Sequence, residues 1–459
     1  MQRLQLLERT EDDRRARRRL GAALGNRLRA ATTDPARMLP LWRTFSVGEP
    51  VRRAELATAM STELVHDAFG TGVLVEVDVD GELPGTWVRA AVCIVPVAIA
   101  GEMIWVASDF PWFEDDPDAV HGPGAATQTL RGLLPTRSPR TLVDLASGSG
   151  ALGVAIACAT GADLVAADLN PRAAALSELT AALNGLALEA QVGDLTDAVT
   201  GRHDLIVCNP PFVLDRPADR TMFRDSEDPR GYAGLAHDLV PLLDEDGIGI
   251  YLTNWRYGPA LPHPLTDLAE DLAALPACDV LVLERAVVTA HDYVRVWTDD
   301  DALAGEWEQA LLAHRTTHVG TGAVLVRRLP DDEDDEATHV STSTAYDLSL
   351  DGLAGLVTGW LAAQQAARAL TSEDRLVAAP YVVEELDDQA SVRATGGLAL
   401  SVTGPAAQVR STAVATLEAL RSPGRLSDVL AAVPALGPSP RTAADLLRTL
   451  LRAGLVRLA

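Results

Sequence analysis

The sequence predicts a doubly wound α/β domain that is flanked by smaller, mostly helical modules. Between residues 121 and 330, short apolar runs alternate with helical stretches, which is typical of a parallel sheet covered by helices on both faces. Helical patterns dominate the flanking residues 1–120 and 340–459. Of the 459 residues, 47% are hydrophobic and 22% charged, so the chain has the length for two to four domains and enough apolar residues for a sizeable core.

The N-terminal module, residues 1–120, is expected to contain helices followed by a small sheet. Helical patterns rich in Leu, Ala and Arg cover residues 1–30, and shorter ones follow up to residue 70. Gly81 and the Pro84-Gly85 pair supply turns. Helices followed by a hairpin are compatible with a winged-helix-like module. The expected strands cover residues 73–79, 87–99 and 103–108.

The central domain, residues 121–330, shows a regular series of strands and helices from about residue 140. Asn170 is a plausible N-cap, Pro171 fits the first helical position, and Gly185 is expected to end that helix. Another helix is expected over residues 151–159. The expected strands cover residues 141–146, 163–167, 188–192, 204–208, 249–253, 279–284 and 322–327.

An acidic linker and a second helical module are expected after the central domain. Pro330 precedes an unbroken run of acidic residues at 331–336, and we interpret residues 331–339 as a solvated linker. Residues 340–459 are rich in Ala and Leu, and a second winged-helix-like module is compatible with them. The expected elements are helices at 406–420, 426–433 and 442–453, and a strand at 455–458.

A glycine-rich turn after the first central strand is the first motif that carries chemistry. The residues from Asp144 to Gly150 read DLASGSG and include Ala146 and Gly148. Glycines let a backbone approach a ligand closely. The helix that follows offers free N–H groups to a carboxylate or a phosphate. Such turns are common, so this motif alone is weak.

Acidic residues also follow the next two strands. Asp168 lies 20 residues beyond Gly148, where an acid can accept hydrogen bonds from both ribose hydroxyls of a nucleoside; helix capping is the alternative role. Asp194 can accept a hydrogen bond from an adenine amino group, and Leu195 can pack on the ring. The carboxyl ends of successive strands form the crevice in which such sheets bind ligands.

The most discriminating motif is the run Asn209, Pro210, Pro211 and Phe212 after the fourth strand. Two prolines fix the backbone and cannot donate hydrogen bonds. The Asn209 side-chain oxygen and the Pro210 carbonyl can then accept the two hydrogens of an NH2 group, which orients the nitrogen lone pair. Phe212 offers a face on which a planar substrate can stack. A proline-rich turn without function is the alternative.

In this order and spacing, the four motifs resemble class I S-adenosylmethionine-dependent methyltransferases of the NPP[F/Y] group. Members of that group methylate release-factor glutamine, adenine amino groups or the exocyclic amine of ribosomal guanine. The resemblance covers roughly residues 120–330. One departure is Ala146, where the family usually has glycine.

The resemblance implies a Rossmann-like domain with S-adenosylmethionine as its cofactor and roles for particular residues. Asp144, Ala146, Gly148 and Gly150 would surround the methionine end of the cofactor, and the loop 121–127, with Thr127 as a weaker contact, would fold over it. Asp168 would bind ribose, and Asp194 with Leu195 the adenine. The catalytic residues, which would grip the acceptor nitrogen, are Asn209, Pro210, Pro211 and Phe212, and Asn209 would also contact the cofactor.

The expected function is therefore methyl transfer to a planar amide or amino nitrogen. Two other readings stay open. The turn at residues 148–153 also matches GxGxxG, so an NAD(P)-dependent oxidoreductase is a rival, although NPPF has no role in one. The other rival is a binding module that has lost activity. Trp255, His291, Asp292 and Tyr293 could border the substrate cavity, and none of them is assigned a catalytic role.

Charge and cysteine content narrow the setting and the partners. The net charge is −25, which favours a peptide, protein or small-molecule acceptor over RNA. RNA stays possible because residues 1–60 hold 13 arginines and 7 acids, a local charge of +6; the arginine cluster at 14–19 contacts an acidic partner or RNA, or is a solvated helix face. The chain contains no lysine, which excludes lysine-dependent chemistry.

Neither a metal site nor a membrane segment is expected. The sequence does not indicate the oligomeric state. The four cysteines are scattered without a CxxC pair, so neither zinc nor a disulfide framework is indicated. We find no signal peptide, and the most apolar stretch, residues 90–100, is too short to span a bilayer. A cytoplasmic location is the expectation.

Overall fold

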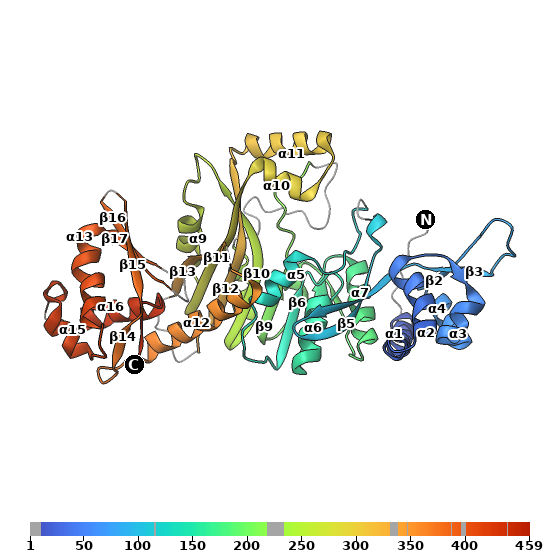
Figure 1. The fold of residues 1–459 in the computed structure, drawn as a ribbon, viewed down its shortest axis with the longest axis horizontal. Helices are drawn as coiled ribbons and strands as arrows, with labels where there is room; N and C mark the ends of the chain where they lie inside the picture. The colour runs from blue at the N-terminus through green and yellow to red at the C-terminus, as the bar shows by residue number, and fades with distance from the viewer. Residues whose placement is uncertain are drawn as a thin grey trace.

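The chain forms three parts that lie in a row, with the central sheet between the two terminal modules (Figure 1). The expected acidic linker, residues 331–339, lies largely outside the described residues. The computed structural model describes residues 11–113, 116–217, 234–330, 338–346, 348–386, 388–395, 401–437 and 439–459.

The central part contains an eight-stranded sheet in the order β13-β11-β12-β10-β9-β6-β7-β8. The pairs from β8 to β10 in this order are parallel, β12 pairs antiparallel with both β10 and β11, and β13 runs parallel to β11. The doubly wound α/β class is thus confirmed. The strands are β6 (Thr141–Leu145), β7 (Asp163–Asp168), β8 (Gln191–Val192), β9 (His203–Cys208), β10 (Leu243–Tyr257), β11 (Cys278–Thr289), β12 (His318–Arg328) and β13 (His339–Thr344).

Helices cover both faces of this sheet because the strands are apolar on both sides. In β9, Leu205 and Val207 join one buried cluster and Ile206 and Cys208 join another, as the twofold alternation of a strand requires. The first cluster includes apolar residues of α5 and α6, and the second includes residues of α8 and α9. These helices and α7 are α5 (Ala125–Gly132), α6 (Ala151–Thr160), α7 (Pro171–Leu183), α8 (Ala236–Leu239) and α9 (Pro264–Leu272).

The expected strands of the central domain are present, but β8 is shorter than expected, and β10, β11 and β12 are clearly longer. The strand expected at 188–192 is only Gln191–Val192, whereas β10 extends well beyond the apolar run at 249–253. Antiparallel pairing with β12 continues from Ile248 to Tyr257 of β10, so backbone hydrogen bonds prolong the strand past its buried centre. The cap of α7 is as expected, since the Asn170 side chain accepts from the Arg172 N–H at 2.9 Å.

The N-terminal module combines four helices with a three-stranded antiparallel sheet in the order β1-β3-β2. The apolar run at 87–99 does not form one strand, because it divides between β3 in this sheet and β4 in a separate hairpin with β5. The elements are α1 (Glu11–Ala31), α2 (Pro35–Trp42), β1 (Val51–Arg52), α3 (Arg53–Met60), α4 (Thr62–Gly70), β2 (Leu74–Val77), β3 (Trp87–Ala90), β4 (Cys93–Ile99) and β5 (Glu102–Ser108).

The β4–β5 hairpin packs on the central domain. Two side chains from α7 and its C-cap accept hydrogen bonds from the backbone of β5: Thr180 accepts from the Ala107 N–H at 3.0 Å, and the C-cap residue Asn184 accepts from the Trp105 N–H at 2.9 Å. Apolar residues of the hairpin, including Ile104, belong to the same buried cluster as α6. The domain boundary at residue 120 therefore stays a proposal, with this hairpin as its contact to the sheet domain.

Helix α1 docks closely on α7 through two glycines and two arginines. Gly21 and Gly25 face Ala182 and Leu183 of α7, and a Cβ on Gly25 would lie 1.9 Å from the Leu183 carbonyl oxygen. Within the arginine cluster, Arg17 is buried and Arg14 donates to Glu189 at 2.7 Å. Part of the cluster thus holds the module in place, and the rest is surface.

The C-terminal module begins with the long helix α12 and ends with small strands and helices. Helices and the final strand occur where the sequence predicts them, with a π-helical turn at Arg410–Val414 inside the first. Sequence reasoning missed α12 and strands β14 to β17. The elements are α12 (Leu350–Ala369), β14 (Leu376–Ala378), β15 (Tyr381–Leu386), β16 (Gln389–Ala394), β17 (Ser401–Pro405), α13 (Ala406–Val409), α14 (Ala415–Ala419), α15 (Leu426–Ala432), α16 (Pro440–Arg452) and β18 (Val456–Leu458).

This module is joined to the central sheet by buried contacts. Arg368 of α12 donates to both carboxylate oxygens of the buried Asp279 on β11, at 2.7 and 2.6 Å. Strand β13 is itself part of the central sheet, so the expected boundary between residues 339 and 340 falls inside a sheet strand. Within the described ranges, none of the helices has the length and hydropathy needed to cross a bilayer.

The close approach of α1 and α7 can be tested with Gly25→Ala. The added methyl group would overlap the Leu183 carbonyl, so we expect the free energy of unfolding to fall by about 1–3 kcal/mol in urea titrations. Gly305→Ala in α11 (Asp301–Ala313) is the matched control, because nothing lies within 4 Å of a Cβ there. Equal effects of the two substitutions would contradict the close packing.

Candidate cofactor and acceptor site

The main cavity lies at the carboxyl ends of β6, β7 and β9, and has a volume of about 770 Å³. The chain runs outward from β6 to β7 and β8 and then returns to β9 on the other side of β6, so this is the topological switch point at which open α/β sheets bind ligands. The residues predicted for the site that line this cavity are Asp144, Ala146, Gly148, Asp168, Asp194, Leu195, Asn209, Pro210, Pro211 and Phe212.

The glycine-rich turn reaches the cavity in a left-handed backbone conformation. Ala146 has φ of +51° and Gly148 has φ of +54°. A left-handed conformation costs an alanine about 1–2 kcal/mol, which is a physical reason for the glycine that the resembling family has at the position of Ala146. Gly150 does not line the cavity: its φ is +71°, and a Cβ there would lie 2.9 Å from Ser177 of α7, so its role is close packing.

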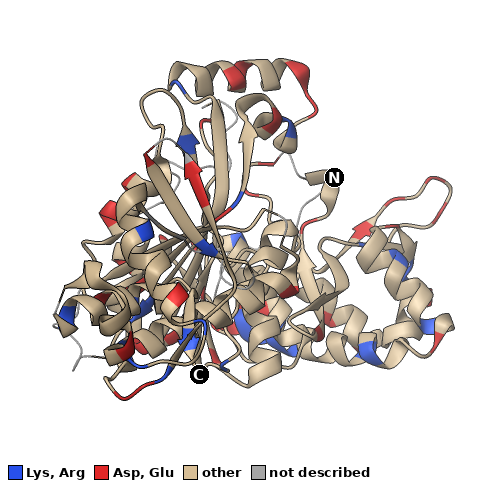
Figure 2. Cartoon of the chain, turned by 60° about the vertical axis from the view of Figure 1, so that its left-hand side comes forward, with Lys and Arg blue, Asp and Glu red and all other residues tan. Residues whose placement is uncertain are grey.

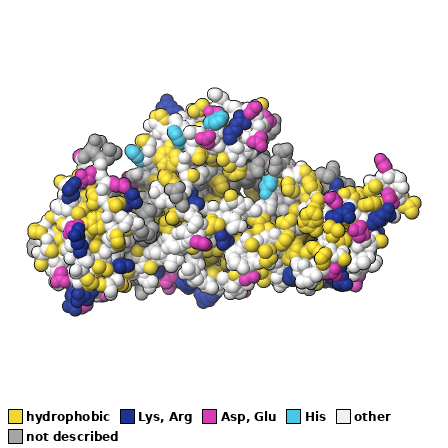
Figure 3. All heavy atoms as spheres, viewed as in Figure 1, with side chains coloured by type: hydrophobic (Ala, Val, Ile, Leu, Met, Phe, Trp, Pro, Cys, Tyr) yellow, Lys and Arg dark blue, Asp and Glu magenta, His cyan; other side chains and the backbone are white. Residues whose placement is uncertain are grey.

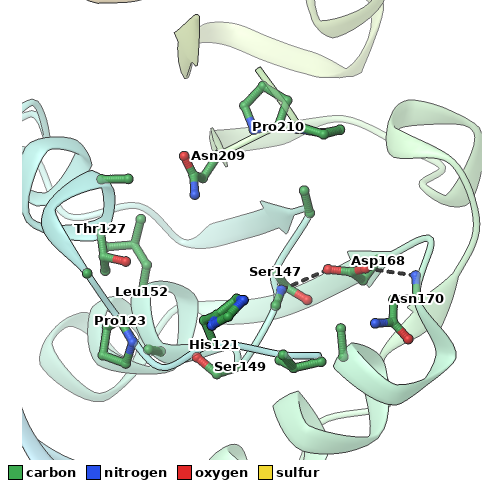
Figure 4. Close-up of a pocket in the computed structure, with 18 of the residues that line it drawn as sticks. His121, Pro123, Thr127, Ser147, Ser149, Leu152, Asp168, Asn170, Asn209 and Pro210 are labelled. Atoms are coloured by element: carbon green, nitrogen blue, oxygen red, sulfur yellow. Dashed lines mark hydrogen bonds between the residues drawn. The ribbon is translucent and has the colours of Figure 1, made fainter. Parts of the chain in front are cut away.

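The buried carboxylate of Asp144 and the half-buried carboxylate of Asp168 line the cavity. Asp144 accepts from the Gly153 N–H at 2.9 Å. Asp168 accepts from the N–H groups of Gly148 and Asn170, both at 2.8 Å, and so connects the glycine turn to the cap of α7 (Figure 4). Burial, with a smaller contribution from the nearby Asp168, raises the pKa of Asp144 to about 7 against the opposing effect of the Gly153 hydrogen bond. Burial also raises the pKa of Asp168.

The third acidic position is exposed. Asp194 follows β8, and its side chain makes no capping hydrogen bond to the short 3-10 helix Leu195–Ala198. Leu195 is half-buried and has φ of +38°. Both residues line the cavity beyond Asp168, so the three acidic positions lie along one wall as the sequence predicts.

The NPPF segment forms another wall of the same cavity. Figure 4 shows Asn209 and Pro210 at one side of the cavity and Asp168 with Asn170 at another. Asn209 is exposed, and within the described part of the chain its side chain makes no hydrogen bond. Pro211 and Phe212 are half-buried, and the Phe212 ring meets the edge of the Trp297 ring at a centroid distance of 6.4 Å. The Asn209 amide is therefore free to meet a ligand.

Two further segments line the cavity. The loop 121–127 lies where the resemblance implies, and Figure 4 shows His121, Pro123 and Thr127 beside the glycine turn. Helix α10 (Ala290–Trp297) contributes Val296 and Trp297, which sequence reasoning missed. The cavity is not lined by the four residues that could have bordered it according to the sequence, which are Trp255, His291, Asp292 and Tyr293. The exposed Val296, at 73%, had no recognisable signal in the sequence beyond its place near Tyr293.

A buried ion pair fixes the segment that leads into this loop. Arg172, in the first turn of α7, donates to Asp109 at 2.8 Å through Nε and makes a second, shorter contact through Nη2. Asp109 also accepts from the Val120 N–H at 2.9 Å, and Asn170 donates to the Asp118 carbonyl at 3.0 Å. Since Val120 lines the cavity, the pair ties its wall to the N-terminus of α7.

The fold and the site of the central part resemble those of class I S-adenosylmethionine-dependent methyltransferase domains. Residues 121–226 match the family model described as methyltransferase small domain. The release factor glutamine methyltransferase of Deinococcus radiodurans is 33% identical over 158 residues, which are 34% of this chain and 48% of that protein. The resemblance predicted from the motifs is thereby confirmed for this part of the chain.

Other relatives match shorter segments. The ribosomal RNA small subunit methyltransferase C of Sodalis glossinidius is 40% identical over 72 residues, 16% of this chain and 21% of that protein. The ribosomal protein L11 methyltransferase of Pelotomaculum thermopropionicum is 38% identical over 102 residues, 21% of this chain and 33% of that protein. The chain thus spans about half or less of the length of these curated relatives. The described residues contain no group of three side chains suited to hold a metal ion.

The buried ion pair can be tested with Asp109→Ala. The substitution would leave Arg172 charged and buried, so we expect the free energy of unfolding to fall by about 3–5 kcal/mol in urea titrations. Asp301→Ala is the control, because its partner Arg295 lies at the surface and such pairs contribute at most about 1 kcal/mol. If Asp109→Ala lowers the free energy of unfolding by less than Asp301→Ala does, the Asp109–Arg172 pair has no supporting role.

The raised pKa of Asp144 predicts a pH dependence of stability. The folded carboxyl ionises near 7 and the unfolded one near its ordinary 3.8, so the contribution of this group is complete below about pH 4 and is lost as the pH rises to 7. We therefore expect Asp144→Asn to gain stability relative to the wild type across this range, by about 1.4 kcal/mol for each pKa unit. Urea titrations at several pH values measure this, with the exposed Asp163→Asn as the control. Parallel pH profiles of wild type and Asp144→Asn would disprove the assignment.

Proposed function

We propose that this protein uses S-adenosylmethionine to methylate a planar amide or amino nitrogen of a peptide, protein or small-molecule acceptor. The observation that carries the proposal is the NPPF segment on the wall of the cavity that also contains Asp144 and Asp168. In this proposal, one cavity would hold the nucleoside and present a pair of acceptors to an NH2 group. The glutamine and RNA methyltransferases similar to this chain support the proposal.

The charges of the cavity suit this cofactor. Its lining includes the carboxylates of Asp144, Asp168 and Asp194, and no arginine is among the described lining residues. A sulfonium ion with an ammonium group is a cation that such a site attracts. When bound, the cofactor supplies an electrophilic methyl group. Asp168 has oxygen lone pairs left for ribose hydroxyls after its two backbone contacts, and Asp194 has an exposed carboxylate for the adenine amino group.

The NPPF segment would position the acceptor nitrogen. The side-chain oxygen of Asn209 and the carbonyl of Pro210 accept the two hydrogens of the NH2 group, and Phe212 stacks on the planar acceptor. Holding the nitrogen at a fixed place and orientation can lower the barrier by roughly 7–11 kcal/mol, so little acid–base chemistry is needed. Partial charge that develops on the hydrogens is met by the same two oxygens.

A peptide, protein or small molecule suits the charge of the molecule better than RNA. The net charge is −25. In the N-terminal module, the loop between β2 and β3 that a winged-helix protein would present to nucleic acid carries acidic positions (Figure 2), among them Asp78, Asp80 and Glu82. RNA methylation stays the second candidate, because a ribosomal RNA methyltransferase is among the relatives. A cytoplasmic setting is part of the proposal and rests on four free cysteines.

The two rival readings receive less support. A dinucleotide would bring two phosphates to a cavity whose described lining has three carboxylates and no arginine. A binding module without activity would not require a free Asn209 amide beside the nucleoside site. Either rival would leave the NPPF segment without a role.

The proposal is tested first by calorimetry of cofactor binding and then by assays of methyl transfer. We expect S-adenosylmethionine to bind and NADH not to bind in titrations of the same sample. Labelled cofactor is then offered with a synthetic peptide that contains glutamine, small-subunit ribosomal RNA and fractionated metabolites. Label in the peptide or a metabolite supports the main proposal, and label in RNA alone supports the second candidate. Binding of NADH without S-adenosylmethionine would refute both.

Asn209→Ala tests the role of the acceptor clamp, which is formed by Asn209, Pro210, Pro211 and Phe212. The substitution removes the side-chain acceptor but leaves Asp144 and Asp168 in place, so we expect turnover to fall by about 100-fold or more while the calorimetric affinity for the cofactor changes little. Thr298→Ala, next to the cavity-lining Trp297 but outside the lining, is the control. Full activity of Asn209→Ala would remove the assigned role.

A further inference from the structure

The segment that continues from the NPPF motif is held by hydrogen bonds from outside the cavity. The Asn254 amide of β10 donates to the Phe212 carbonyl at 3.0 Å. The same amide donates to the Tyr293 hydroxyl of α10 at 3.0 Å, and the Leu214 N–H donates to that hydroxyl at 3.0 Å. Two backbone groups of the segment are thus fixed by one amide and one phenol that contact each other.

These contacts are buried, so they define the backbone strongly. Asn254 and Tyr293 are each 2% exposed, and the fully buried Trp307 of α11 donates to the Leu214 carbonyl at 2.7 Å. A buried donor that loses its partner keeps its full desolvation cost. A rotated backbone at Phe212 or Leu214 would break several of these bonds at once, so the network selects one orientation of the segment.

The helix that supplies Tyr293 also forms the acceptor side of the cavity. Val296 and Trp297 lie three and four residues after Tyr293, and therefore on the same side of α10. Both line the cavity, and the Trp297 ring meets the Phe212 ring. In Figure 3 the surface beneath the α10–α11 pair is largely apolar. The position of α10 thus affects the cavity wall through Val296 and Trp297. Through Tyr293 it also affects the backbone of the segment that continues from the NPPF motif.

We propose that Tyr293 and Asn254 are positioning residues for methyl transfer, which set the direction of the Pro210 carbonyl and the Phe212 ring through the Phe212 and Leu214 backbone. Neither residue is among those that line the cavity, so we assign neither of them a contact with the acceptor. The two prolines restrict the chain before Phe212, and the network fixes it after Phe212. The clamp is held at both ends as a result. This inference rests on the proposed function for its catalytic consequence, but not for its structural part.

The structural part is tested by hydrogen exchange at the Leu214 N–H. Tyr293→Phe keeps the ring and removes the hydroxyl, so we expect the exchange of the peptide containing Leu214 to become at least about 10-fold faster, in line with the loss of one hydrogen bond. Asn254→Ala provides a second variant that reaches the segment through the Phe212 carbonyl. Tyr257→Phe is the matched control: it removes a hydroxyl from the same strand as Asn254, where it contacts Glu284 at 2.6 Å.

The catalytic part is tested by kinetics with the synthetic glutamine peptide as the acceptor. We expect Tyr293→Phe to lower kcat by about 10- to 100-fold, because small misplacements of a reacting group have effects of that size. The calorimetric affinity for S-adenosylmethionine should stay within about twofold, and Tyr257→Phe should keep wild-type kcat. A role limited to stability would instead lower the melting temperature and leave kcat unchanged.

The outcomes separate this inference from the proposed function. Faster exchange at Leu214 together with reduced kcat and intact cofactor binding supports the inference. Unchanged exchange, or faster exchange with unchanged kcat, overturns it. If the wild type methylates neither the peptide nor any other acceptor, the proposed function fails. The exchange result then still decides whether the network fixes the segment.

Discussion

The two hydrogen bonds that Asp168 accepts are the contacts on which the site depends most. One carboxylate joins the turn after β6, through the Gly148 N–H, to the cap of α7, through the Asn170 N–H. Because β6 and β7 are parallel neighbours, their carboxyl ends lie at the same edge, and a single side chain can connect both turns. The same residue therefore shapes the cavity and supplies its charge. Removing this carboxylate from water is unfavourable, and its pKa is raised as a result.

The flanking modules attach to the helices that carry the cavity walls. At one end, α1 packs on α7, and the Asp109–Arg172 pair connects the same helix to the loop before residue 121. At the other end, α12 packs on α5, where a Cβ on Gly132 would lie 3.2 Å from Leu350. Helix α5 begins in the loop that lines the cavity. Both modules thus brace the cofactor side of the central domain, and this gives them a structural role whatever partners they bind.

Local sequence patterns predicted the features of the fold and site that depend on residues close together in the chain. Strands β6 to β9 are short apolar runs with acidic residues at or near their carboxyl ends. Because parallel strands have their carboxyl ends at the same edge of a sheet, Asp144, Asp168 and Asp194 could be placed in one cavity from the sequence alone. Contacts between distant segments could not be read in this way. Strand β13 joins the sheet only through its pairing with β11, and Gly150 contacts Ser177 rather than the cavity. Tyr293 meets the clamp across 79 residues of chain, with no motif to mark it.

The electrostatics of the cavity link its occupancy to its protonation. Burial, with a smaller contribution from the Asp168 carboxylate, raises the pKa of Asp144 to about 7, so near neutral pH Asp144 is only partly ionised in the absence of a cation. A cation beside the two carboxylates favours the ionised forms, and its own binding is favoured by ionisation in return. An anionic ligand gains nothing from this coupling. The carboxylates of Asp144 and Asp168 therefore favour a cationic ligand over an anionic one, and such a ligand would offset part of the unfavourable burial of Asp144.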